Sequence, residues 1–132
     1  MANRVSGTFE VKLTPQAGGD EPAGVGRMTI DKRFSGGLEA TSRGVMLAVR
    51  TAVEGSAGYV AMEVVEGALD GRRGTFVFQH GGTMLRGEQR LSIEVVPDSA
   101  TGELSGLSGR LEITFEEGVH YYELEYSLDP TP

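Results

Sequence analysis

Apolar and polar residues alternate along most of this chain. In the first run, residues at odd positions from Val5 to Leu13 are apolar or glycine, and residues at even positions are polar. This period of two is typical of β-strands with one buried face, and nowhere does the spacing of an amphipathic helix persist. Similar runs predict about eight strands in all, the others lying near residues 28–34, 38–53, 57–67, 74–80, 90–96, 110–116 and 119–128.

The residues between the runs support these boundaries. Proline cannot donate a ladder hydrogen bond, and all five prolines lie outside the predicted strands. We expect a flexible loop over residues 15–25, where two prolines and three glycines fall close together. A sandwich would suit such short strands too, but closure into a barrel removes every exposed edge. We therefore predict one domain, residues 1–132, folded as an all-β, eight-stranded antiparallel β-barrel.

The last two strands predict a specific register. A two-residue turn at Glu117–Gly118 places apolar side chains on one face of the hairpin and charged ones on the other. The predicted pairs are Phe115 with His120, Ile113 with Tyr122, Leu111 with Leu124, Arg110 with Glu125 and Glu112 with Glu123. A shift by one residue would mix the two faces. The two opposed glutamates repel each other, and we expect Arg110 to relieve that repulsion.

Composition narrows the choice of partners. Twelve Lys and Arg against 19 Asp and Glu give a net charge of −7, which disfavours binding to nucleic acid or to an anionic membrane surface. The absence of cysteine excludes disulfides, thiolate catalysis and cysteine-bound metals. No apolar run reaches the roughly 20 residues of a membrane-spanning helix, and the first residues do not resemble a signal peptide. We expect a cytoplasmic protein.

Both histidines of the chain fall on the apolar side of their runs. His80 continues the series of Phe76 and Phe78, and His120 begins a series that continues with Tyr122. If these faces point inward, two imidazoles share the barrel interior, where they are suited to general acid–base catalysis near neutral pH. The alternative is that each is a core residue bonded to the backbone. Neither HxH nor HExxH spacing occurs, so we predict no metal site.

Tyr59 and Glu63 lie on a strand that is apolar on both sides. The even positions from Val60 to Val64 are apolar, and so are Ala61 and Val65 between and beyond them. Alternation therefore does not decide which side faces inward. Tyr59 and Glu63 are either cavity residues or interface residues.

Five segments, taken in order, resemble a small bacterial family of unknown function. They are GTFEV (7–11), MTIDKRF (28–34), GSAGYVA (55–61), FQH (78–80) and VVPDSATGEL (95–104). Ala100 departs from the family, which commonly has glycine there. That family is similar in fold to allene oxide cyclase, an eight-stranded barrel of the calycin type. Plant allene oxide cyclases close a ring in an unsaturated fatty-acid epoxide without a cofactor, and related barrels cyclise polyketides. The likeness is one of fold and transfers no catalytic residue.

Three hypotheses for function follow. The leading one is a barrel that binds a small, largely apolar molecule, with ligand-binding residues Tyr59, Glu63, Phe78, Tyr122, Met28 and Phe34. The second is an isomerase or cyclase acting on an unsaturated or epoxide substrate. In it His80 or His120 moves a proton, and Tyr59, Glu63 or Tyr122 orients the substrate. The third is a self-associating module that docks through Val60, Met62 and Val64. We expect a homo-oligomer, and neither a cofactor nor a metal.

Overall fold

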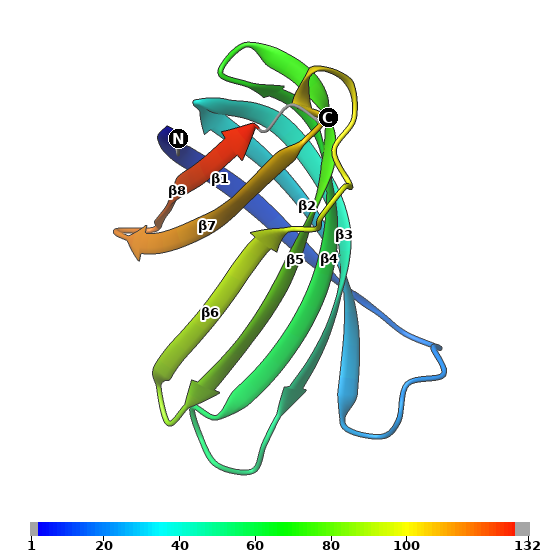
Figure 1. Cartoon of the computed structure of the whole chain (residues 1–132). Helices are drawn as coiled ribbons and strands as arrows, with labels where there is room; N and C mark the ends of the chain where they lie inside the picture. Colours follow the sequence, from blue (N-terminus) through cyan, green and yellow to red (C-terminus); the bar gives the residue numbers. More distant parts are fainter. Residues whose placement is uncertain (1–2, 129–132) are drawn as a thin grey trace.

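The computed structural model describes residues 3–128, which form a closed antiparallel β-barrel (Figure 1). Each strand pairs with the next in sequence, and β8 pairs with β1. The strands are β1 (Asn3–Gln16), β2 (Val25–Gly36), β3 (Leu38–Arg50), β4 (Ala57–Leu69), β5 (Arg72–Leu85), β6 (Glu88–Val95), β7 (Leu107–Glu116) and β8 (Val119–Leu128). One 3-10 turn, η1 (Gly102–Leu104), lies between β6 and β7. The predicted eight-stranded barrel is confirmed. Nothing helical among residues 3–128 has the length and apolar character needed to cross a membrane.

The predicted hairpin of β7 and β8 is confirmed in every pair. Its turn places Glu117 at φ 49° and Gly118 at φ 80°, the two positive values that a tight hairpin turn requires. The expectation for Arg110 is wrong, because its guanidinium pairs with Glu94 of β6 at 3.0 Å. Arg4 of β1 relieves the opposed glutamates instead, with its guanidinium 3.2 Å from Glu123 and 2.8 Å from Glu125.

The prediction that all prolines lie outside the strands is wrong for Pro15. This residue lies inside β1, opposite Met28 of β2. Strand β1 pairs with β8 only as far as Phe9, so its last residues have a partner strand on one side alone. A proline is tolerated on such an edge because no neighbour awaits its missing N–H. The connection to β2 therefore covers residues 17–24 and projects beyond the barrel (Figure 1). Its flexibility stays a prediction.

One end of the barrel is solidly packed. Rings and branched side chains from all eight strands fill it, and Phe34, Phe76 and Phe78 are at most 1% exposed. Leu104 of η1 is fully buried and covers this end, held by a backbone bond of 2.8 Å from Thr101 to Thr75. No element within residues 3–128 covers the opposite end in this way. A ligand-binding site can therefore lie at the open end or in the wall of the barrel, but not in the packed end.

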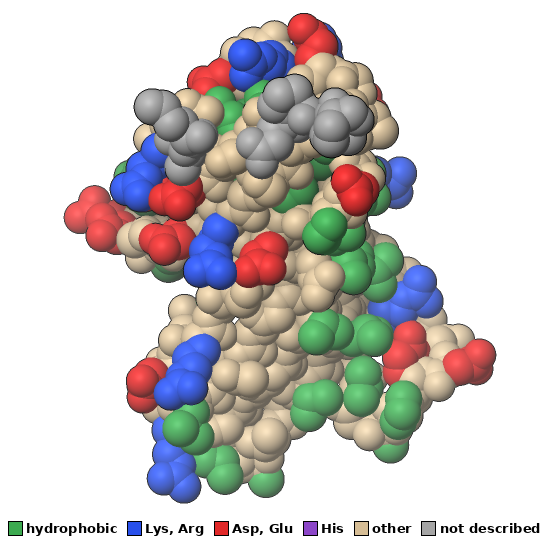
Figure 2. Space-filling model, viewed as in Figure 1, with side chains coloured by type: hydrophobic (Ala, Val, Ile, Leu, Met, Phe, Trp, Pro, Cys, Tyr) green, Lys and Arg blue, Asp and Glu red, His purple; other side chains and the backbone are tan. Residues whose placement is uncertain are grey.

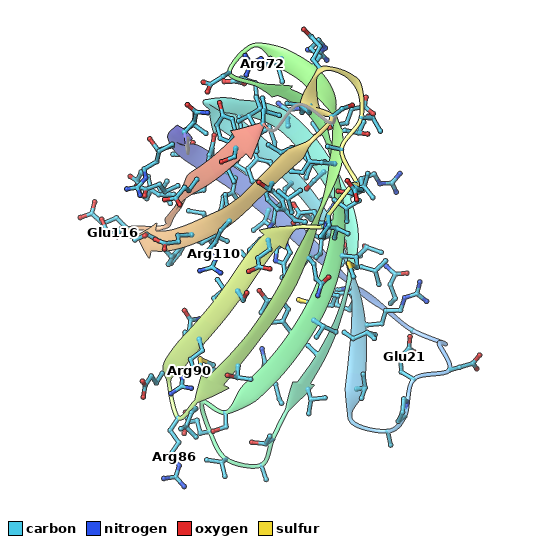
Figure 3. The ribbon with its side chains drawn as sticks, viewed as in Figure 1. Glu21, Arg72, Arg86, Arg90, Arg110 and Glu116 are labelled. Carbon is cyan, nitrogen blue, oxygen red and sulfur yellow. The ribbon has the colours of Figure 1, made fainter. Side chains whose placement is uncertain are left out.

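The wall is weakest between β6 and β7. Among the described residues these strands share a single register pair, Glu94 with Arg110, and beyond it they splay apart (Figure 1). Figure 3 shows Arg110 at this junction. The residues of β6 before Glu94 and those of β7 after Arg110 therefore form open strand edges.

The outer face of β3 and β4 is apolar. It carries six exposed side chains, which Figure 2 shows gathered over the lower part of these strands: Val45, Leu47, Val49, Val60, Met62 and Val64. This decides the question left open by the sequence, because the even positions of β4 face outward and Tyr59 and Glu63 face inward. Self-association through this face stays a prediction.

Candidate functional site

An apolar cavity of about 290 Å³ lies at the open end of the barrel. Its wall is built mainly from inward-facing side chains of β1 to β6, among them Leu13, Met28, Met46, Tyr59, Met84 and Leu91. Gly82 lies in this wall, where a Cβ atom would come within 2.6 Å of the Tyr59 ring and 3.0 Å of Leu91. The glycine thus lets these two side chains close over the base of the cavity. Arg50 and Arg90 lie at the rim, and Figure 3 shows Arg90 near the β5–β6 turn.

A second recess, of about 410 Å³, follows the opening between β6 and β7. Apolar residues of both strands line it, including Leu91, Ile93, Leu111 and Ile113. Leu91 belongs to both the recess and the cavity. The recess and the cavity therefore adjoin each other at Leu91.

Deeper in the barrel lies a buried polar cluster centred on Glu63. Its carboxylate is fully buried, and its Oε1 atom accepts hydrogen bonds from Lys32 Nζ at 3.0 Å and His80 Nε2 at 2.7 Å. Its Oε2 atom accepts a bond from Ser42 Oγ at 2.5 Å. Lys32 also lies over the ring of Phe9, with 5.0 Å from Nζ to the ring centroid. A buried carboxylate needs such partners, because an unpaired charge is costly in a medium of low dielectric.

These contacts keep Glu63 ionised. Burial alone would raise the pKa of its carboxyl group. The hydrogen bond from His80, the positive charge of Lys32 and the hydrogen bond from Ser42 outweigh burial and lower that pKa from 4.5 to about 2. Burial, followed by the negative charge of Glu63, raises the pKa of the Tyr59 hydroxyl. Tyr59 therefore keeps its proton at neutral pH and serves as a hydrogen-bond donor.

The lowered pKa of Glu63 predicts a loss of stability in acid. Because the folded-state value lies below the unfolded value near 4.5, the stabilisation is complete above that pH and disappears as pH falls toward 2. The loss is on the order of 3 kcal/mol. Urea unfolding between pH 7 and pH 2.5 should show this component in the wild type and not in Glu63→Gln. Carboxyl ¹³C NMR of the wild type gives an independent check, and a Glu63 midpoint at or above 4.5 would contradict the prediction.

His80 and Tyr59 each keep one polar atom available. No buried side-chain nitrogen or oxygen among residues 3–128 lacks a hydrogen-bond partner. His80 Nδ1 and the Tyr59 hydroxyl bond to no described residue, so neither atom is sealed from solvent. The two rings meet edge to face, with 6.3 Å between their centroids. Since Tyr59 lines the cavity, the pair connects the cavity to the buried cluster.

The other predicted site residues lie in four different places. Met28 lines the cavity, whereas Phe34 and Phe78 are fully buried in the packed core. The hydroxyl of Tyr122 receives a bond from Leu38 N at 2.9 Å and lies 2.9 Å from Ser35 O, so it fastens the β2–β3 connection. His120 is half-buried and stacks on Phe9, 4.9 Å between centroids. Only Met28, Tyr59, Glu63 and His80 thus belong to the cavity or to the cluster beneath it.

Sequence reasoning missed two members of the cluster, Lys32 and Ser42. A signal for Lys32 was present, because it occupies an inward-type position between Ile30 and Phe34 in an otherwise apolar series. A charged residue on the buried face of a strand implies a buried partner of opposite charge. Ser42 gives no comparable signal, since serine suits either face of a strand. Within residues 3–128, no group of three His, Asp or Glu side chains is arranged to hold a metal.

Comparison with known proteins places this barrel in a family. The model of a protein family of unknown function, DUF3224, matches residues 5–126. The chain belongs to the DUF3224 family. A crystal structure of a DUF3224 protein of unknown function from Shewanella oneidensis MR-1 is 51% identical to it. The two superpose with a TM-score of 0.93 over 99% of this chain and 100% of that one. The predicted resemblance to a bacterial family of unknown function is confirmed, and no curated protein matches this DUF3224 chain.

Proposed function

We propose that this DUF3224 barrel binds a small, largely apolar molecule in the cavity at its open end. The observation that carries the proposal is the unequal filling of the interior. Phenylalanine and leucine side chains pack one end completely, whereas methionine, leucine and alanine side chains surround a space of about 290 Å³ at the other. A barrel of eight strands is wide enough for one small ligand when its side chains do not fill it.

The lining suits a ligand with little polarity. Met28 and Met46 lie opposite each other on β2 and β3, and Met84 lies opposite Ala57 on β5 and β4. Methionine side chains are flexible and polarisable, so they adapt to apolar surfaces of varied shape. The Tyr59 hydroxyl is a polar group in this wall that can orient one end of the ligand. This combination of an apolar wall with few polar groups is typical of small-molecule sites.

The test is a titration with N-phenyl-1-naphthylamine, a neutral dye whose fluorescence rises in apolar surroundings. Met46→Trp fills the cavity, whereas Met62→Trp places the same ring on the outer face of the neighbouring strand. We expect saturable binding by the wild type and by Met62→Trp, and affinity at least about tenfold weaker in Met46→Trp.

Two results would overturn the proposal. One is the absence of saturable binding by the wild type. The other is loss of dye binding in Met62→Trp with binding retained in Met46→Trp, which would place the dye on the apolar outer face. Circular dichroism of both variants checks that the barrel is intact.

A further inference from the structure

The buried cluster has the geometry of an oriented imidazole base. Glu63 is ionised and accepts a hydrogen bond from His80 Nε2 at 2.7 Å, so that nitrogen carries the proton in the neutral ring. The opposite nitrogen, Nδ1, then holds a free lone pair. Because Nδ1 has no partner among residues 3–128 and is not sealed from solvent, its lone pair is available to a bound molecule. A carboxylate that fixes the tautomer of a histidine is a recurring arrangement in base catalysis.

The surroundings separate this base from a merely structural histidine. His80 is bonded on one side alone, through Nε2 to Glu63, and its Nδ1 atom accepts no bond from a described residue. Lys32 shares the Oε1 atom of Glu63 with His80, which keeps the carboxylate charged without occupying Nδ1. Tyr59 lies against the ring of His80, lines the cavity and holds a hydroxyl with no described partner. A base therefore lies directly beneath the apolar cavity, against a hydrogen-bond donor that lines it.

We propose that His80 and Tyr59 catalyse proton transfer on an apolar ketone held in this cavity, a step that rests on the proposed binding function. His80 Nδ1 removes a proton from the carbon next to the carbonyl group, and the electron pair of that C–H bond forms an enolate. Tyr59 donates a hydrogen bond to the enolate oxygen, where the negative charge develops. Where the ketone carries a double bond between its β and γ carbons, the imidazolium returns its proton to the γ carbon. The double bond then lies between the α and β carbons, and no oxidant, reductant or cofactor takes part.

Each residue has a separate role in this step. His80 and Tyr59 are the catalytic residues, because they touch the substrate. Glu63 is a positioning residue that fixes the tautomer of His80 through the bond to its Nε2 atom. Lys32 and Ser42 hold Glu63 in place through bonds of 3.0 Å and 2.5 Å.

The experiment uses cyclohex-3-enone and measures two quantities. Displacement of N-phenyl-1-naphthylamine reports binding, and NMR in D₂O reports exchange of the protons next to the carbonyl group and formation of the conjugated enone. We expect exchange by the wild type to fall by about 10² to 10⁴-fold in His80→Gln and by about 10²-fold in Tyr59→Phe. Dye affinity is measured in both variants in parallel, so that a loss of binding is separated from a loss of proton transfer. Gln79→Ala, on the outer face beside His80, should exchange like the wild type.

The outcomes distinguish this inference from the binding proposal. If the dye binds but the ketone does not displace it, the inference fails and the binding function stands. If the ketone binds and exchange does not exceed that of free imidazole at equal concentration, the catalytic roles are wrong. Loss of exchange in His120→Gln with His80→Gln unaffected would move the base to the other histidine. If neither dye nor ketone binds, both proposals fail.

A second measurement tests whether Glu63 fixes the tautomer of His80, and its first part needs no substrate. In ¹⁵N NMR of the wild type, the neutral form of His80 should carry its proton on Nε2 and not on Nδ1. Glu63→Gln should change the tautomer ratio of His80 and the pH profile of exchange. A neutral His80 whose proton lies on Nδ1 in the wild type would overturn the proposal, whatever the exchange rates.

Discussion

Replacing Lys32 by methionine is expected to destabilise the folded protein by about 3–5 kcal/mol at pH 7. Methionine retains most of the volume of the lysine stem but removes the charge that faces Glu63 at 3.0 Å. The side chains of Lys32 and Glu63 are only 6% and 0% exposed, so water cannot replace the missing charge. The carboxylate must then stay buried without its cation or take up a proton, and either outcome costs free energy. Urea unfolding followed by circular dichroism measures the loss.

Two further variants isolate the cause. Arg43→Met removes a cation from an exposed pair with Asp31 at 3.7 Å, and we expect a change within about 0.5 kcal/mol. Adding Glu63→Leu to Lys32→Met removes the uncompensated charge, so the double variant should be more stable than Lys32→Met alone. If Lys32→Met lost less than 1 kcal/mol, or the double variant lost more than the single one, the cluster would not depend on this charge pair.

The barrel could be predicted because its determinants are local and repetitive. Alternation fixes which residues of a strand share a face, and a two-residue turn fixes the register of its hairpin. These two rules were sufficient for every pair between β7 and β8. They did not predict the ion-pair partner of Glu123. That partner is Arg4 of β1, the strand that pairs with β8 where the barrel closes.

The site could be predicted only in part, for a related reason. Histidines on inward positions pointed to the interior, and His80 does lie there beside Tyr59 and Glu63. The sequence could not separate His80 from His120, because the difference lies in their partners on other strands. Glu63 of β4 orients one ring, and Phe9 of β1 stacks on the other. Nor could it show that one end of the interior is filled and the other hollow, since that depends on how side chains from eight strands meet.

Phe78→Ala is expected to cost about 3–5 kcal/mol, because it removes a fully buried ring from the packed end of the barrel. Phe78 meets Phe76 edge to face, with centroids 5.0 Å apart, and lies beneath His80 at 6.4 Å. Its neighbours come from several strands of a closed barrel and cannot all move inward to fill the space. Urea unfolding of the variant measures the cost.

Phe115→Ala provides a matched control on β7. This phenylalanine also occupies an inward-type position, but it is 61% exposed because β7 has left β6 at that point. We expect its loss to cost less than about 1 kcal/mol.

A further variant, Phe78→Leu, separates packing from ligand binding at Phe78, which the sequence placed among the ligand-binding residues. Phe78→Leu keeps most of the buried volume, so dye affinity equal to that of the wild type would assign this ring to the core. A large loss of affinity in stable Phe78→Leu would instead extend the ligand site below His80.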